Sequence, residues 1–141
     1  MRKVNREAKR VLDKLTADLK DKPPGNAVKF DRGTYMAVHV ESLADVDEGR
    51  IYSVAHYYEQ NGDLMRDPDM TFLHSSIDGN YYPASFRQDG GLPIDQESIV
   101  FDADWPDGGT RLAFRARLQR QHAVFAGQWM DNIRQQQHLF A

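Results

Sequence analysis

The sequence predicts an α+β domain in which an antiparallel sheet packs against helices from the two ends of the chain. Three observations predict it: a helical apolar pattern near the N-terminus, a series of strand-like segments separated by tight turns, and a longer helical pattern near the C-terminus. The 141 residues contain no internal repeat and no dividing linker, so we expect a single domain over residues 1–141.

The N-terminal helix is predicted from apolar residues that recur every three or four positions between Val4 and Leu19. Asn5 is placed to cap its start. Pro23, Pro24 and Gly25 cannot continue a helix, so the helix has about four turns.

The middle of the chain is predicted to form the sheet. Strand-like segments lie at residues 27–30, 34–40, 50–59, 69–74, 81–88 and 97–101. Asn61-Gly62 suits the type I′ turn of a hairpin, and Pro68 indicates a bulge or an edge. Asp78-Gly79-Asn80 predicts the next turn. Successive strands joined by short turns favour an antiparallel meander of four or five strands.

The C-terminal segment contains the longest helical pattern. Residues 102–109 are predicted to form a connecting loop, and a helix is expected over residues 114–138. One stripe of that helix carries Leu118, His122, Phe125, Trp129 and Ile133. We expect both helices to cover the same face of the sheet.

Composition limits the location of the protein and its chemistry. The chain has no cysteine, which excludes disulfides, thiolate metal sites and a cysteine nucleophile. No window approaches the roughly 20 apolar residues that cross a bilayer, so we expect a cytoplasmic protein without membrane contact.

Charge is strongly segregated along the chain. Residues 1–40 hold ten Lys and Arg against five Asp and Glu, residues 41–107 hold three against fifteen, and residues 108–141 hold five against one. The favoured interpretation is that basic terminal helices compensate an acidic sheet; the alternative is an acidic face presented to a basic partner. The acidic balance argues against nucleic acid as the partner.

An acidic hairpin over residues 59–69 is the candidate metal site. Its carboxylates could bind Mg²⁺ or Ca²⁺ through oxygen and support a metal-dependent hydrolase or nuclease. They belong to Glu59, Asp63, Asp67 and Asp69. Turn and bend chemistry explains the same residue types without a metal, and this second interpretation is favoured.

Other catalytic signatures are incomplete. His39-Val40-Glu41 has the His-x-Glu spacing of zinc deaminases, but the cysteines of such a site are missing. No serine lies in a Gly-x-Ser-x-Gly elbow, and no glycine-rich phosphate loop occurs. The residues therefore favour a protein without catalytic residues or a cofactor.

Aromatic residues provide the candidate interaction surface. Adjacent tyrosines on a strand point to opposite faces, so one member of each pair cannot face the helices. An exposed tyrosine patch bordered by acids would suit a protein partner, because tyrosine and tryptophan are common at binding hot spots. The candidate residues are Tyr57, Tyr58, Tyr81, Tyr82 and Trp105.

Three stretches, at residues 57–72, 81–90 and 117–137, carry a resemblance to a known family. They read YYEQNGDLMRDPDMTF, YYPASFRQDG and RLQRQHAVFAGQWMDNIRQQQ. They resemble the DUF6908 type of small uncharacterised proteins encoded by phages, plasmids and integrative elements. The resemblance implies a setting among mobile genetic elements and no particular activity.

Together these features favour a non-catalytic protein-interaction module of a mobile genetic element. It could inhibit a host defence system in the manner of an anti-CRISPR protein, or serve as an adaptor. The metal-dependent hydrolase or nuclease at residues 59–69 is the alternative. An exposed sheet face is compatible with a homodimer and equally with a monomer.

Overall fold

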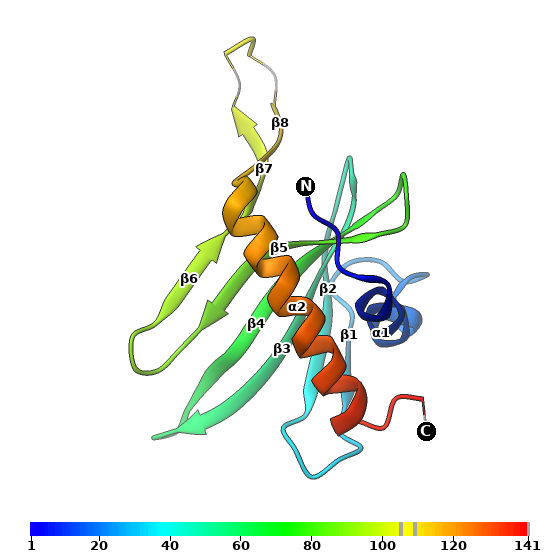
Figure 1. Ribbon diagram of the computed structural model, residues 1–141, viewed down its shortest axis with the longest axis vertical. Helices are drawn as coiled ribbons and strands as arrows, with labels where there is room; N and C mark the ends of the chain where they lie inside the picture. The colour runs from blue at the N-terminus through cyan, green and yellow to red at the C-terminus, as the bar shows by residue number, and fades with distance from the viewer. Residues whose placement is uncertain (105, 109, 141) are drawn as a thin grey trace.

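The computed structural model describes residues 1–104, 106–108 and 110–140. It confirms the α+β class, with two helices, a six-stranded antiparallel sheet and a separate two-stranded sheet (Figure 1). The elements in chain order are α1 (Arg6–Thr16), the 3₁₀ helix η1 (Ala17–Leu19), β1 (Ala27–Phe30), β2 (Val38–Val46), β3 (Gly49–Gln60), β4 (Asp63–Ser75), β5 (Tyr81–Gln88), β6 (Ile94–Glu97), β7 (Ile99–Asp104), β8 (Thr110–Phe114) and α2 (Ala116–Gln136).

The main sheet is a meander, as predicted, but it has more strands than the four or five expected. Its strands follow the chain order β1-β2-β3-β4-β5-β6, and each pairs antiparallel with the next. The turn between β3 and β4 has positive φ at Asn61 (53°) and Gly62 (85°), which matches the predicted hairpin turn. Short turns therefore bring consecutive strands side by side.

The predicted strand at residues 97–101 is divided at Ser98. The Ser98 N–H donates to Ala84 O at 2.8 Å, while its carbonyl accepts from the Arg115 N–H at 2.9 Å. The chain stays beside β5 up to this residue and then leaves as β7, which pairs with β8. Residues 102–109 were predicted as a loop; instead β7 continues to Asp104 and β8 begins at Thr110. The resulting hairpin projects from the main body (Figure 1).

The predicted strand at residues 34–40 begins later, at Val38, and continues to Val46. The preceding segment is held by the end of the C-terminal helix rather than by a neighbouring strand. The buried Gln137 side chain accepts from the Arg32 N–H at 2.7 Å and donates to Met36 O at 3.1 Å. These long-range bonds replace ladder hydrogen bonds at this point.

Both helices cover one face of the main sheet, as predicted. Asn5 caps α1, with its side chain accepting from the Ala8 N–H at 2.8 Å. One apolar core joins the helices to the sheet, and its largest contributors are Leu12, Leu15, Leu19, Tyr52, Met70, Phe72, Tyr81, Met130 and Ile133. The opposite face of the sheet, which we call the open face, carries no helix (Figure 1).

Candidate functional site

Two rows of side chains cross the open face and form the candidate site. In β2, β3 and β4 these residues alternate with the buried core residues Val40, Val54 and Met70, so they point away from the helices. The first row is Lys29, His39, Ala55, Asp69, Arg87 and Asp95, from β1 to β6. The second is Ala27, Glu41, Ser53, Thr71, Ser85 and Glu97. We call these twelve positions the polar band.

The middle of the polar band is built from small residues. Ser53, Ala55 and Ser85 are 7%, 1% and 3% exposed, although no helix covers this face of the sheet. Ser53 Oγ donates to Asp69 Oδ1 at 2.8 Å, and the hydroxyls of Thr71 and Ser85 lie 2.5 Å apart. These bonds link β3, β4 and β5 through their side chains.

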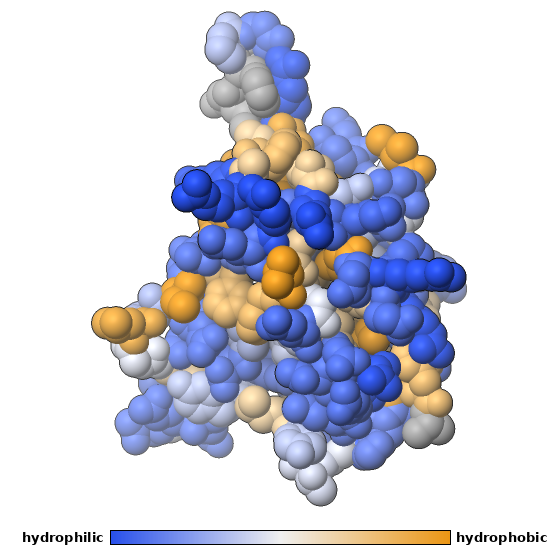
Figure 2. All heavy atoms as spheres, in the orientation of Figure 1, coloured by the Kyte–Doolittle hydropathy of each residue, from blue (hydrophilic) through white to orange (hydrophobic). Residues whose placement is uncertain are grey.

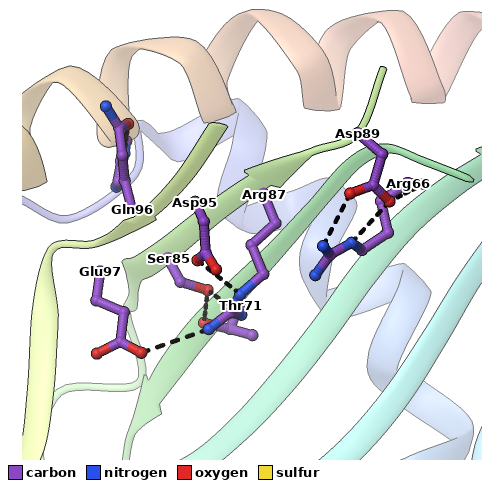
Figure 3. A network of polar contacts seen from close by, with 9 residues as sticks. Arg66, Thr71, Ser85, Arg87, Asp89, Asp95, Gln96 and Glu97 are labelled. Carbon is purple, nitrogen blue, oxygen red and sulfur yellow. Dashed lines mark hydrogen bonds and ion pairs between the residues drawn. The ribbon is translucent and has the colours of Figure 1, made fainter. Parts of the chain in front are cut away.

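Arginines at the rim of the band are held by carboxylates (Figure 3). Arg87 Nε lies 3.0 Å from Asp95 and its Nη2 lies 3.4 Å from Glu97, so one guanidinium holds both acids of β6. Arg66 forms a two-pronged contact with Asp89 at 2.9 and 3.0 Å. Asp89 also accepts from the Arg66 N–H, and these bonds hold the pKa of Asp89 down at about 2.

Asp69 lies at the centre of the band with a different environment. Burial raises the pKa of this carboxyl above its ordinary value; the Ser53 hydrogen bond and the charges of Arg87 and Arg66 oppose the rise without cancelling it. The negative charge of Glu41 adds to the rise. Within the part of the chain that the structure describes, no Lys or Arg forms an ion pair with Asp69. It is a half-buried acceptor without a basic partner.

Tyr57 and His39 adjoin Asp69 on the open face. Their rings pack edge to face with centroids 5.1 Å apart. Burial lowers the pKa of His39, and burial together with the nearby charges of Asp69 and Glu41 raises the pKa of Tyr57. The pair is therefore a neutral aromatic wall beside the central carboxylate.

The other predicted tyrosines do not share this surface. Tyr81 was predicted to belong to the interaction surface, and this prediction is wrong because its side chain is fully buried. Its hydroxyl lies 2.8 Å from Asp13 and 3.0 Å from Thr16 of α1. Tyr82 is half-buried and donates to Asp78 at 2.5 Å, while Tyr58 lines a hollow of about 580 Å³ beside the β5–β6 loop. Trp105 lies outside the described residues. Of the predicted residues that the structure describes, Tyr57 alone borders the polar band.

The four carboxylates of the metal hypothesis do not gather in one place. Glu59 and Asp63 are exposed near the tip of the β3–β4 hairpin, whereas Asp69 lies opposite Ala55 in the middle of the sheet. Asp67 lines the hollow that contains Tyr58. The register irregularity opposite Ala55 and Tyr57 lies between Asp67 and Asp69 and interrupts the strand alternation there. Over residues 1–104, 106–108 and 110–140, no group of three His, Asp or Glu side chains is arranged to hold a metal ion.

A serine–histidine pair that the sequence did not reveal lies between β6 and α2. His122 Nε2 lies 3.0 Å from Gln96 Oε1, and its Nδ1 lies 2.8 Å from Ser98 Oγ, both within hydrogen-bond distance. Ser98 is 0% exposed and also contacts Pro83 O, so no substrate reaches its hydroxyl. The pair fixes the point where the chain leaves the sheet.

The helix layer and the sheet layer do not exchange ion pairs among the described residues. Every ion pair described for the helices and the main sheet joins two groups of the same layer, as in Lys9–Asp13 of α1 or Arg87–Asp95 of the sheet. The expected compensation of the sheet by the helices is therefore not made through direct ion pairs. The exposed surface over α1 and α2 is mainly hydrophilic, with apolar patches that include the β5–β6 loop (Figure 2).

Sequence reasoning did not bring Ser53, Thr71, Ser85 and Arg87 together on the surface that holds Asp69. Each lies at an alternating position of a predicted strand, and that was the available signal. The rows become visible only through the strand register, which shifts at three irregularities: Ser42/Ala44, Ala55/Tyr57 and Thr71/Phe72.

Comparison with known proteins gives one match. The family model described as "Domain of unknown function (DUF6908)" matches residues 8–139. No curated protein and no solved structure matches the chain. None of the described helices is long and apolar enough to cross a membrane.

Proposed function

The chain belongs to the DUF6908 family, and from its open face we propose that it is a non-catalytic module that binds a basic segment of another protein. The observation that carries this proposal is Asp69, a half-buried carboxylate at the centre of an uncovered sheet face. It accepts a hydrogen bond from Ser53 and forms no ion pair with the described residues.

A basic side chain from a partner would satisfy this carboxylate. The nearest arginines of the chain, Arg66 and Arg87, are already bound to Asp89 and to the acids of β6. A lysine or arginine brought over the band would meet Asp69 and Glu41 together. Removing water from such a pair strengthens its attraction, and close charge pairs contribute strongly to specificity at interfaces.

The shape of the band suits recognition of a protein surface. Its centre is formed by small, buried residues, and His39 and Tyr57, whose rings pack edge to face, form an aromatic border beside them. Rigid aromatic residues beside charged groups are common at the centre of protein interfaces. The family resemblance suggests the cytoplasm of a cell that carries a mobile element. There the module would act as an inhibitor of host defence or as an adaptor.

The test is a complex reconstituted from purified proteins. A stoichiometric partner is first identified by cross-linking in cells, and its Kd is then measured for the wild type, Asp69→Asn and Asp47→Asn. Asp47 is exposed in the β2–β3 turn, so the control removes one negative charge away from the band. We expect Asp69→Asn to weaken binding about tenfold or more and Asp47→Asn to change it little. Equal affinities for all three proteins, or no stoichiometric partner, would contradict the proposal.

A further inference from the structure

The outer edge of β6 is one of the two edges of the main sheet, and both rows of the polar band end at it. β6 is the last strand in the sheet order, and its four residues Ile94–Glu97 are all exposed. In Figure 1 no other element lies along its outer side. A free strand edge offers unpaired N–H and C=O groups to another extended chain.

The hydrogen-bond pattern identifies the groups that point outward. Ser98 N–H donates to Ala84 O, and the register places Gln96 opposite Phe86 and Asp95 opposite Arg87. In an antiparallel ladder, hydrogen-bonded residue pairs alternate with non-hydrogen-bonded pairs. Gln96 lies two residues before Ser98, so its backbone N–H and C=O also point toward β5. Asp95 and Glu97 belong to non-hydrogen-bonded pairs, so their backbone N–H and C=O groups point away from β5, toward the outer edge of β6.

The two sides of this edge differ in chemistry. On the open face, Asp95 and Glu97 end the two rows of the polar band, and Arg87 alone holds both carboxylates. On the helix side, Ile94 is 39% exposed and follows Leu92, which is 93% exposed. Phe86 lies inward on the same side and packs against Phe125 of α2. An added strand would thus meet acids on one face and apolar side chains on the other.

We propose that β6 binds an extended segment of a partner protein in which basic and apolar residues alternate. The basic residues would lie beside Asp95 and Glu97, and the apolar residues beside Ile94 and Leu92. This inference rests on the proposed function, because the same partner would cover the band that these acids end. Backbone pairing supplies affinity in such strand addition, and alternate side chains supply specificity.

Charge argues against a second copy of this chain as the occupant. In a continuous antiparallel sheet, opposite residues point to the same face. Two copies of β6 would therefore oppose Asp95 and Glu97 with the same acids of the other copy. Directly opposed like charges destabilise strand pairing.

The test uses the full chain labelled with ¹⁵N and three synthetic peptides. The probe alternates lysine and valine, a charge-reversed control alternates glutamate and valine, and a third peptide is the lysine–valine probe with alternate backbone nitrogens methylated. Hydrogen exchange at the Asp95 and Glu97 amides is the measurement. We expect the lysine–valine peptide to slow exchange at both amides about tenfold or more, and the two controls to have no such effect.

A pair of variants isolates the backbone contribution. Asp95→Pro removes an outward N–H without breaking the ladder to β5, whereas Asp95→Ala removes the same carboxylate and keeps the N–H. We expect Asp95→Pro to abolish peptide protection at Glu97 and Asp95→Ala to retain part of it. If the proline variant does not fold, the methylated peptide on the wild-type chain provides the same comparison.

Several outcomes would overturn the inference. They are no protection at either amide, equal protection by the methylated peptide, or protection that rises with protein concentration alone, which would indicate a second copy. Failure of the edge can be told from failure of the proposed function. If Asp69→Asn loses partner binding but the β6 amides stay unprotected in the wild-type complex, strand addition at β6 is excluded and partner binding by the polar band is supported.

Discussion

Aspartates in this protein show how the environment determines the chemistry of a single residue type. Asp69 lies in β4 and Asp89 directly follows β5; burial raises the pKa of Asp69, whereas hydrogen bonds from Arg66 lower the pKa of Asp89 to about 2. Asp78 behaves like Asp89: its pKa is lowered to about 2, chiefly by the hydrogen bond from the Tyr82 hydroxyl. A carboxylate with several donors is stabilised by folding, and one that is buried with few donors is not.

These opposite shifts predict opposite effects of substitution by asparagine. The folded-state pKa of Asp69 lies above the unfolded value, so its ionised form costs stability at pH 7, and the cost disappears as pH falls below 3.8. Asp69→Asn should therefore raise Tm at pH 7 and leave it nearly unchanged at pH 3.5. Asp89 contributes stability above pH 3.8 that is lost as pH falls toward 2. Asp89→Asn should lower Tm at pH 7, and this deficit should shrink at acidic pH.

Thermal unfolding at a series of pH values checks both variants against the wild type. A lowered Tm for Asp69→Asn at pH 7 would contradict the prediction, because it would show that Ser53, Arg87 and Arg66 together outweigh the cost of burying the carboxylate.

At the level of elements, tight turns set the register of the strands and thereby assemble the polar band. Gly49 begins β3 with φ of +151°, and a Cβ there would collide with the backbone carbonyl of His74 on β4. Gly62, in the β3–β4 turn, has φ of +85° with nothing within 4 Å of such an atom. Gly49 is therefore required both because a side chain would collide with β4 and because of its positive φ, whereas Gly62 is required by its positive φ alone.

Alanine substitutions at the two glycines should separate these requirements. Gly62→Ala places an alanine at positive φ and should cost about 1 kcal/mol of unfolding free energy. Gly49→Ala adds a collision with rigid backbone and should cost about 2 kcal/mol or more. Urea unfolding measures both, and equal losses would indicate that β4 moves to admit the new Cβ.

At the scale of the whole molecule, burial acts on several histidines in the same direction. His39 lies on the open face, and His56 packs against Trp129 of α2. His122 belongs to α2 and stacks on Phe86, and His74 stacks on Tyr81. For all four, burial is the largest cause of a lowered pKa. The folded protein thus holds fewer protons on these rings than the unfolded chain.

Stability should therefore fall as the solution is acidified through the ordinary histidine range. The unfolded pKa is near 6.5 and the folded values are lower, so the loss begins near pH 7 and continues below 6.5. We expect Tm to decrease between pH 7.5 and pH 5.5, and His39→Gln to reduce that slope. A Tm that is constant or rises over this range would contradict the prediction.

Much of the fold could be predicted from local patterns. The apolar spacing around Leu12, the Asn5 cap and the Asn61-Gly62 turn depend on interactions between residues close in sequence, and the structure confirms all three. The division at Ser98 could not be predicted, because its bonds to Ala84, Arg115 and His122 join distant parts of the chain. The later start of β2 has the same cause, since Gln137 holds the segment before it.

The candidate site was predictable only in part. Asp69 was predicted as part of a metal site and Tyr57 as part of a tyrosine patch. The described residues assemble neither the metal site nor the full patch. Tyr81 has the same sequence context as Tyr82, yet α1 buries it through Thr16 and Asp13. Strand alternation predicts two faces and does not say which residues of different strands meet.

The sequence by itself determined the α+β class, the helix near each end of the chain, the antiparallel meander between them and the segregation of charge along the chain, because these depend on periodicity, turn chemistry and composition. Tertiary structure alone decided which side chains cross the open face together, that Asp69 among them forms no salt bridge with the described residues, and that β6 forms an edge of the sheet. Those properties depend on register and on contacts between residues far apart in sequence, and small irregularities at three points of the sheet change them.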